Sequence, residues 1–304
     1  MTTSDIPLIS VIIPTYNYGH LIPRVLDSVL GQLTQSDELI VVNDGSRDNT
    51  VDVLSNYQER YPQLQVFHQD NAGAAAARNA GIRHARGRFA LLLDADDELL
   101  PQALATLRGL VLAHPGCGMV LGGQISVYPD GRERLRLPTP VPTVGPRELA
   151  RRYLLQKRIS ISHCCSLFRR DLLLQRPYPE SLRSGEDIPV FAYLLVSAAV
   201  LTTNEPLARI YKHADSLRHN RDNEEECANI LLREVFASLP VECQPLRKRY
   251  EAQRYLSLFR SAQLAGDAAA ARRFYLHALH LSPQQALRWN YLRKVLRLLS
   301  VRAN

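Results

Sequence analysis

The chain has 304 residues, of which 46% are hydrophobic and 22% are charged, a balance typical of a globular protein that buries a sizeable core. The longest run without charge, residues 188–204, is interrupted by Pro189 and is too short to predict a membrane span. Its net charge of +7 favours an anionic partner: nucleic acid, an anionic membrane surface or a phosphorylated substrate. Five cysteines without a CxxC spacing exclude a disulfide framework, so we expect a cytoplasmic protein.

Short apolar runs alternate with amphipathic stretches over the first third of the chain. Strands apolar on both faces are predicted at residues 10–13, 39–42, 65–68 and 89–93. Helices are predicted at residues 20–33, 48–60, 74–86 and 101–113. This alternation predicts an α/β fold with a mostly parallel, Rossmann-like sheet flanked by helices.

The pattern becomes less regular after the fourth helix. We expect a proline-rich loop at residues 137–146 to lie over the site. Around it we predict strands at 119–127, 160–168 and 200–203, and helices at 147–156 and 186–197. From about residue 227 the chain is wholly helical. We therefore divide it into a domain of residues 1–220 and a helical C-terminal extension of residues 221–304.

The C-terminal extension is strongly basic, with 13 Lys and Arg against 4 Asp and Glu over residues 227–304. Residues 287–301 have the pattern of a basic amphipathic helix, for which two interpretations stay open. The helix contacts an anionic membrane surface, which would make the protein peripheral on the inner face of the cytoplasmic membrane. Alternatively, it packs on the first domain with its arginines in water. Because few aromatic residues accompany the basic excess, we expect no nucleic-acid partner.

Acidic side chains follow two of the predicted strands. Asp44 comes after the strand at 39–42, and Asp94, Asp96 and Asp97 follow the strand at 89–93. Ligands of open α/β sheets bind beyond the carboxyl ends of the strands. Three neighbouring aspartates repel one another unless a cation lies between them, and their oxygens suit Mn²⁺ or Mg²⁺, which also bind substrate phosphates. The pattern therefore predicts a divalent cation beside a phosphate-bearing substrate.

Four motifs in this chain resemble those of the family 2 glycosyltransferases, which are inverting enzymes with the GT-A fold. The motifs are Ser10-Val-Ile-Ile-Pro-Thr-Tyr-Asn17, Val42-Asn-Asp-Gly-Ser46, Ala76-Ala-Arg-Asn-Ala-Gly81 and Leu93-Asp-Ala-Asp-Asp97. The resemblance covers about residues 8–220. It implies a metal-dependent hexosyl- or N-acetylhexosaminyl-transferase. The donor would be a nucleotide-diphosphate sugar, most often a UDP-sugar, and the acceptor a hydroxyl of a glycan or lipid-linked molecule in bacterial cell-surface polysaccharide or lipopolysaccharide assembly.

The resemblance also implies which residues bind the donor. They are Pro14, Thr15, Tyr16, Asn17, Asp44, Arg78, Asp94 and Asp96. Within this set, Thr15 and Tyr16 would line the nucleobase pocket, and Asp44 would accept a hydrogen bond from the base. Asp94 and Asp96 match the family's DxD motif, with Asp94 towards the ribose and Asp96 towards the metal and the diphosphate.

The remaining implied roles concern the metal and the acceptor. Asp96, Asp97 and His213 are the implied metal ligands, and the division of work between Asp96 and Asp97 stays open. An inverting transfer needs one carboxylate to take the acceptor's proton, and Asp187 in the Ser184-Gly-Glu-Asp187 segment is the implied base. Glu186 and His163 are placed on the acceptor side. Both acids of this segment would also stabilise a helix N-terminus.

Two other classes remain to be compared with this interpretation. A sugar-nucleotide pyrophosphorylase needs a glycine-rich loop after the first strand, where this chain has only Gly19. A non-catalytic nucleotide-sugar-binding module of the same fold would be expected to lose acids from the site. The presence of Asp44, Asp94 and Asp187 favours an active enzyme over such a module.

Overall fold

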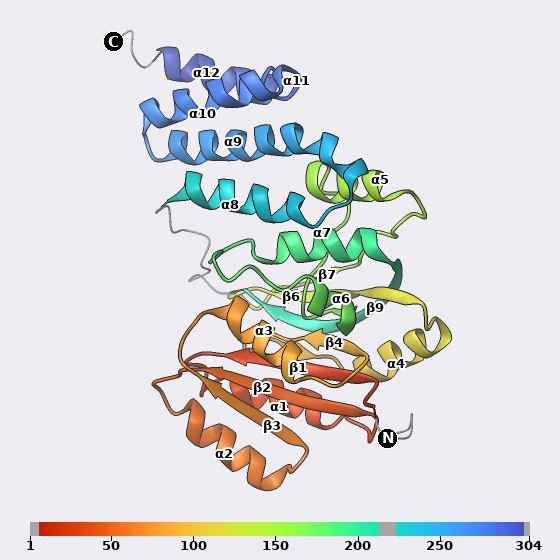
Figure 1. Cartoon of the computed structure of the whole chain (residues 1–304). Helices are drawn as coiled ribbons and strands as arrows, with labels where there is room; N and C mark the ends of the chain where they lie inside the picture. Colours follow the sequence, from red (N-terminus) through yellow and green to blue (C-terminus); the bar gives the residue numbers. More distant parts are fainter. Residues whose placement is uncertain (1–5, 213–222, 301–304) are drawn as a thin grey trace.

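The computed structural model describes residues 6–212 and 223–300 and confirms an α/β fold with a helical C-terminal region (Figure 1). Within these residues, the strands form one sheet in the order β3-β2-β1-β4-β8-β6-β9-β5, and β7 pairs with β6. The strands are β1 (Ile9–Thr15), β2 (Asp37–Asp44), β3 (Leu64–Gln69), β4 (Phe89–Leu92), β5 (Glu98–Leu99), β6 (Cys117–Val127), β7 (Glu133–Arg136), β8 (Ser166–Arg169) and β9 (Ala199–Tyr211).

The parallel part of the sheet is the part predicted from the first third of the chain. Strands β3, β2, β1 and β4 are parallel neighbours, and Thr15 at the end of β1 pairs with Asn43 near the end of β2. Beyond them the sheet is mixed. β8 runs antiparallel to both β4 and β6, and β9 runs parallel to β6 but antiparallel to β5. The carboxyl ends of the parallel strands thus meet at one edge of the sheet.

Helices cover both faces of the sheet. They are α1 (Ile22–Leu30), α2 (Thr50–Arg60), α3 (Ala74–His84), α4 (Ala103–Ala113), α6 (Arg170–Gln175) and α7 (Asp187–Ser197). Alternate residues of β1 face opposite ways: Val11 packs with α1, α2 and α4, whereas Ile12 packs with α3, α6 and α7. α3 lies very close to β1, because a Cβ on Gly81 would come 2.3 Å from Cγ2 of Ile12.

Three predicted elements differ from the structure. Only Ser166–Arg169 of the strand predicted at 160–168 is a strand, because the chain turns before it, where Ser166 N–H donates to His163 O. The strand predicted at 200–203 extends over the whole of β9, because it pairs along β6 and with β5. The helix predicted at 147–156 consists of α5 (Pro146–Ala150) followed by a π-helical turn, η1 (Arg151–Leu155).

The C-terminal helices stack away from the sheet (Figure 1). They are α8 (Glu224–Ala237), the 3₁₀ helix η3 (Val241–Leu246), α9 (Arg247–Leu264), α10 (Ala268–Leu281), α11 (Pro283–Ala286) and α12 (Trp289–Ser300). One apolar cluster joins α8 and η3 to α5 and α7, and a second joins α9, α10 and α11. The domain boundary at residues 220/221 lies outside the described residues and stays a prediction. None of the described helices is long and apolar enough to cross a membrane.

Candidate active site

The loops that follow β1 and β2 are tied together at the edge of the sheet. Asn17 has a positive φ of 56°, and its N–H donates to Ser46 Oγ at 2.9 Å while its Oδ1 accepts from Arg47 N–H at 2.8 Å. Thr15 is buried, and its Oγ1 has no hydrogen-bond partner within the described part of the chain. Tyr16 is 41% exposed beside it. This edge of the sheet therefore has one open aromatic ring, that of Tyr16, beside a buried and unpaired hydroxyl, and their contacts with a nucleobase stay a prediction.

Asp44 at the end of β2 holds the segment that leads into α3. Its Oδ1 accepts from Gln69 Nε2 at 2.7 Å and from Ala72 N–H at 2.9 Å, and its Oδ2 accepts from Gly73 N–H at 2.8 Å. A carboxylate has about four acceptor positions, so one remains at Oδ2. Asp44 thus has a structural role that the sequence did not show. Its contact with a base stays a prediction.

The acids after β4 lie in a turn, in which Asp97 N–H donates to Asp94 O. Asp97 is buried, and its Oδ1 accepts from Tyr211 N–H at 2.9 Å while its Oδ2 accepts from Cys164 Sγ at 3.0 Å. Burial and the neighbouring charge of Asp94 raise the pKa of Asp97 to about 7. Without a cation, Asp97 therefore binds a proton readily near neutral pH.

The described residues bring Asp94, Asp97 and Cys164 together as potential ligands, with one ligand atom of each within 4.8 Å of the others. Two carboxylates suit Mn²⁺ or Mg²⁺, which complete their coordination with waters and substrate phosphates. Burial and both carboxylates raise the pKa of the Cys164 thiol well above its usual value, so it donates to Asp97 as a neutral thiol. The residues therefore fit a hard divalent cation held by Asp94 and Asp97.

The other two expected metal ligands have different outcomes. The backbone carbonyl of Asp96 accepts a hydrogen bond from Arg24, whose guanidinium lies over the ring of Tyr211, 3.8 Å from its centroid. Arg24 thus positions the turn that carries the acids. The roles of the Asp96 side chain at the metal and the diphosphate stay predictions. His213 lies outside the described residues.

Arg78 on α3 joins the acids after β4 to those before α7. Its guanidinium donates to Asp94 Oδ1 at 2.9 Å and to Glu186 Oε1 at 2.8 Å, and its side chain is only 8% exposed. Burial opposes its charged form, but Asp94, Tyr178 and Glu186 outweigh burial and raise the pKa of Arg78. Burial would raise the pKa of Asp94, but Arg78 holds it below its ordinary value. Asp94 is thus kept ionised.

Asp187 is the first residue of α7, directly after Glu186. Burial and the charge of Glu186 raise the pKa of Asp187 above its ordinary value, while Arg78 and the N–H groups of Asp187 and Ile188 oppose the rise. A carboxylate at a helix N-terminus with a raised pKa is a better proton acceptor than a fully solvated one. This environment fits a general base.

His163 is buried among aromatic side chains. Its Nε2 lies 2.9 Å from Tyr178 Oη, and its ring packs against Phe168 and Phe191. Burial, followed by the charge of Arg78, lowers the pKa of His163 to about 3, so the ring is neutral. It supports the wall behind Arg78. The acceptor-side roles of His163 and Glu186 stay predictions.

Sequence reasoning missed several groups around these acids. Cys164 and the backbone N–H of Tyr211 hydrogen-bond to Asp97, and Glu186 pairs with Arg78 although 108 residues separate them. Spacing carries no signal for such contacts, because they depend on how β8 and β9 enter the sheet. The sequence motifs placed the acids at the strand ends without showing these partners.

Known proteins share parts of this sequence and its fold. The family model for glycosyl transferase family 2 matches residues 10–176. A glycosyltransferase of Escherichia coli, YibD, is 43% identical over 104 residues, which cover 34% of this chain and 30% of YibD. Chondroitin synthase of Pasteurella multocida is 36% identical over 126 residues, covering 41% of this chain and 13% of that protein. The chain thus matches less than a third of the length of either relative.

Two solved structures share the fold. TarS residues 1–349 of S. aureus in complex with UDP-GlcNAc has a TM-score of 0.66 at 20% identity, covering 89% of this chain and 81% of that one. The mannosyltransferase PcManGT of Pyrobaculum calidifontis, in complex with GDP-Man and Mn²⁺, has a TM-score of 0.53 at 20% identity, covering 97% and 86%. With the family model matching more than half of its residues, the chain belongs to glycosyl transferase family 2 and has the GT-A fold.

Proposed function

We propose that the chain is an inverting glycosyltransferase that moves a sugar from a nucleotide-diphosphate sugar to an acceptor hydroxyl. The donor that we propose is a UDP-sugar. One observation carries the proposal: the buried pairing of Arg78 with both Asp94 and Glu186 connects the acids after β4 to the carboxylate at the start of α7. The pairing holds Glu186, which directly precedes the proposed base Asp187, close to the acids that we propose bind the donor. TarS, whose complex contains UDP-GlcNAc, supports a UDP-sugar as donor.

Transfer with inversion is a single displacement. Asp187 takes the proton of the acceptor hydroxyl. At the same time the acceptor oxygen bonds to the anomeric carbon, and the bond between that carbon and the diphosphate breaks. Arg78 keeps Asp94 ionised, so that Asp94 and Asp97 can hold a divalent cation. When bound, Mn²⁺ or Mg²⁺ neutralises the charge that develops on the departing diphosphate. PcManGT, whose complex contains Mn²⁺, supports this use of a metal.

The substitution Asp187→Asn tests the base. The assay measures UDP release from UDP-GlcNAc, UDP-glucose or UDP-galactose in the presence of an oligosaccharide acceptor array. We expect the rate of UDP release to fall by about 100-fold or more in this variant, while its affinity for UDP stays unchanged. Asp52→Asn is the matched control, because Asp52 is an exposed acid in the first turn of α2. Normal turnover by Asp187→Asn would show that another group is the base.

The same assay separates an enzyme from the alternative, a non-catalytic module of the same fold. A module would bind UDP with Mn²⁺, as a rise in melting temperature would show, without releasing UDP from any donor in the array. The acids of the site favour the enzyme. We place its acceptor among glycans or lipid-linked molecules of bacterial cell-surface polysaccharide or lipopolysaccharide assembly, in line with the relative named for a polysaccharide synthase in P. multocida.

We also propose that the start of α12 contacts an anionic membrane. Tyr291 and Val295 pack on the cluster of α9, α10 and α11, so part of the helix is held by the C-terminal extension. Leu287 and Trp289 remain 52% and 71% exposed beside exposed arginines. Flotation with phosphatidylglycerol vesicles tests this contact. Trp289→Ala should reduce binding of the full chain to the vesicles, and an unchanged bound fraction would refute the proposal.

A further inference from the structure

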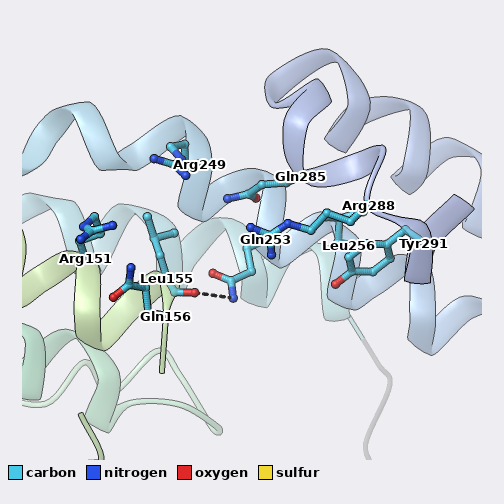
Figure 2. Close-up of a pocket in the computed structure, with 9 residues that line it drawn as sticks. All are labelled: Arg151, Leu155, Gln156, Arg249, Gln253, Leu256, Gln285, Arg288 and Tyr291. Atoms are coloured by element: carbon cyan, nitrogen blue, oxygen red, sulfur yellow. Dashed lines mark hydrogen bonds between the residues drawn. The ribbon is translucent and has the colours of Figure 1, made fainter. Parts of the chain in front are cut away.

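A pocket lies away from the candidate active site, where η1 meets α9 and the helices at the end of the chain (Figure 2). It has a volume of about 110 Å³, which corresponds to roughly four water molecules at ~30 Å³ each. The polar side chains that line it and carry the argument are Arg151, Gln156, Arg249, Gln253, Gln285 and Arg288. The pocket can therefore hold a small polar group.

Three carbonyl oxygens in this pocket have no partner. The Oε1 atoms of Gln156, Gln253 and Gln285 are buried and accept no hydrogen bond within the described part of the chain. Gln285 is only 8% exposed. In Figure 2 it enters from α11, while Gln253 lies on α9 and donates from its Nε2 to Leu155 O. Unsatisfied buried acceptors are costly, so this set favours an occupant that donates hydrogen bonds.

Cationic side chains surround these oxygens. Neither Arg249 nor Arg288 forms an ion pair with a carboxylate in residues 6–212 and 223–300. Arg151 is held in place by Glu148, with Nε to Oε2 at 2.7 Å and Nη2 to Oε1 at 2.8 Å. Two unpaired guanidinium groups beside a small cavity favour an anion, and their fork geometry suits phosphate oxygens.

The π-helical turn η1 contributes to this pocket. Gln156 N–H donates to Arg151 O, five residues earlier, at 3.1 Å. This wider turn brings Arg151 and Gln156 to the same side of the chain, so both line the pocket. π-helical turns are rare and often occur at functional sites.

We propose that this pocket binds a phosphate ester that carries neighbouring hydroxyl groups. The arginines would bind the phosphate, and the three glutamine carbonyls, which water does not reach in this structure, would turn towards the occupant and accept from the hydroxyls. A groove of about 470 Å³ shares Arg151 and Arg249 with the pocket and is lined further by Arg147 and by the carboxylates of Glu148 and Glu242, so the phosphate can belong to a longer molecule. A soluble phosphopolyol and a phosphoglycerol lipid headgroup have this chemistry in common. The site is independent of the transfer reaction proposed above.

Calorimetric titration of the full chain with sn-glycerol 3-phosphate tests the proposal, together with flotation on phosphatidylglycerol vesicles. Arg249→Gln/Arg288→Gln should weaken binding by about tenfold or more. The control Arg260→Gln/Arg272→Gln removes the same charge from α9 and α10, at arginines that are exposed like Arg249 and Arg288 but lie outside the pocket and outside α12, and should bind as the wild type does. Equal urea unfolding midpoints would show that the pocket variant is folded.

A single-residue variant tests the hydroxyl contacts. Gln285→Met should weaken binding of glycerol 3-phosphate but not of sulfate, which has no hydroxyl group to donate. A loss of glycerol 3-phosphate binding in the double pocket variant supports a soluble or acceptor-borne phosphate. A loss of vesicle binding alone in Arg249→Gln, which leaves the membrane contact proposed for the start of α12 unchanged, supports a lipid headgroup. The proposal would be overturned if the wild type bound neither glycerol 3-phosphate nor the vesicles, or if the pocket and control variants bound both equally well.

Discussion

Removing Arg78 should destabilise the protein more than removing any exposed arginine. Its side chain is 8% exposed and pairs with Glu186 at 2.8 Å and with Asp94 at 2.9 Å. Breaking a buried ion pair by deleting one partner costs about 3–5 kcal/mol, because the other charge stays buried. Glu186 is 16% exposed, but Asp94 is 36% exposed and water screens it. We therefore expect Arg78→Met to lower the free energy of unfolding by about 3 kcal/mol.

Urea unfolding at neutral pH measures this loss. The control Arg132→Met breaks the pair with Asp130, in which both side chains are exposed, at 77% and 52%, so it should cost at most about 1 kcal/mol. In a double-mutant cycle, Glu186→Gln should recover part of the loss caused by Arg78→Met, with a coupling of about 0.5–3 kcal/mol. A loss no larger than that of the control, or no coupling, would refute the assignment of Arg78 as the connection between the two sets of acids.

Two further predictions concern Asp97 and Gly81. Folding raises the pKa of Asp97 to about 7, so its contribution to stability is full below the unfolded pKa of about 4 and is lost as pH rises through 7. In EDTA, Asp97→Asn should reduce the fall in unfolding free energy between about pH 5 and 8, and an unchanged fall would contradict the shift. Gly81→Ala places a Cβ 2.3 Å from Ile12 and should cost about 1–3 kcal/mol in urea unfolding. Gly109→Ala in α4, where no atom lies within 4 Å, should instead stabilise by up to about 1 kcal/mol. Equal effects of the two alanines would contradict the close packing of α3 on β1.

The parallel half of the sheet could be predicted because its signals are local. Strands β1, β2 and β4 contain continuous apolar runs and β3 is partly polar, and helices α1, α2 and α3 connect them in turn, so period and order alone predict their arrangement. The second half could not be predicted in the same way. β8 is short and antiparallel, and β9 is long only because β6 and β5 pair with it. Such pairing depends on partners far away in the sequence.

By itself, the sequence determined the family, the α/β fold, the acids at the strand ends and the helical C-terminal region, because motifs and periodicity lie within short segments. Only the tertiary structure decided which groups those acids meet. Asp44 holds the segment before α3, Asp97 lies beside Cys164, and Arg78 connects Asp94 to Glu186. Burial and neighbouring charge then determine the pKa of each group, and both arise only when distant segments pack together.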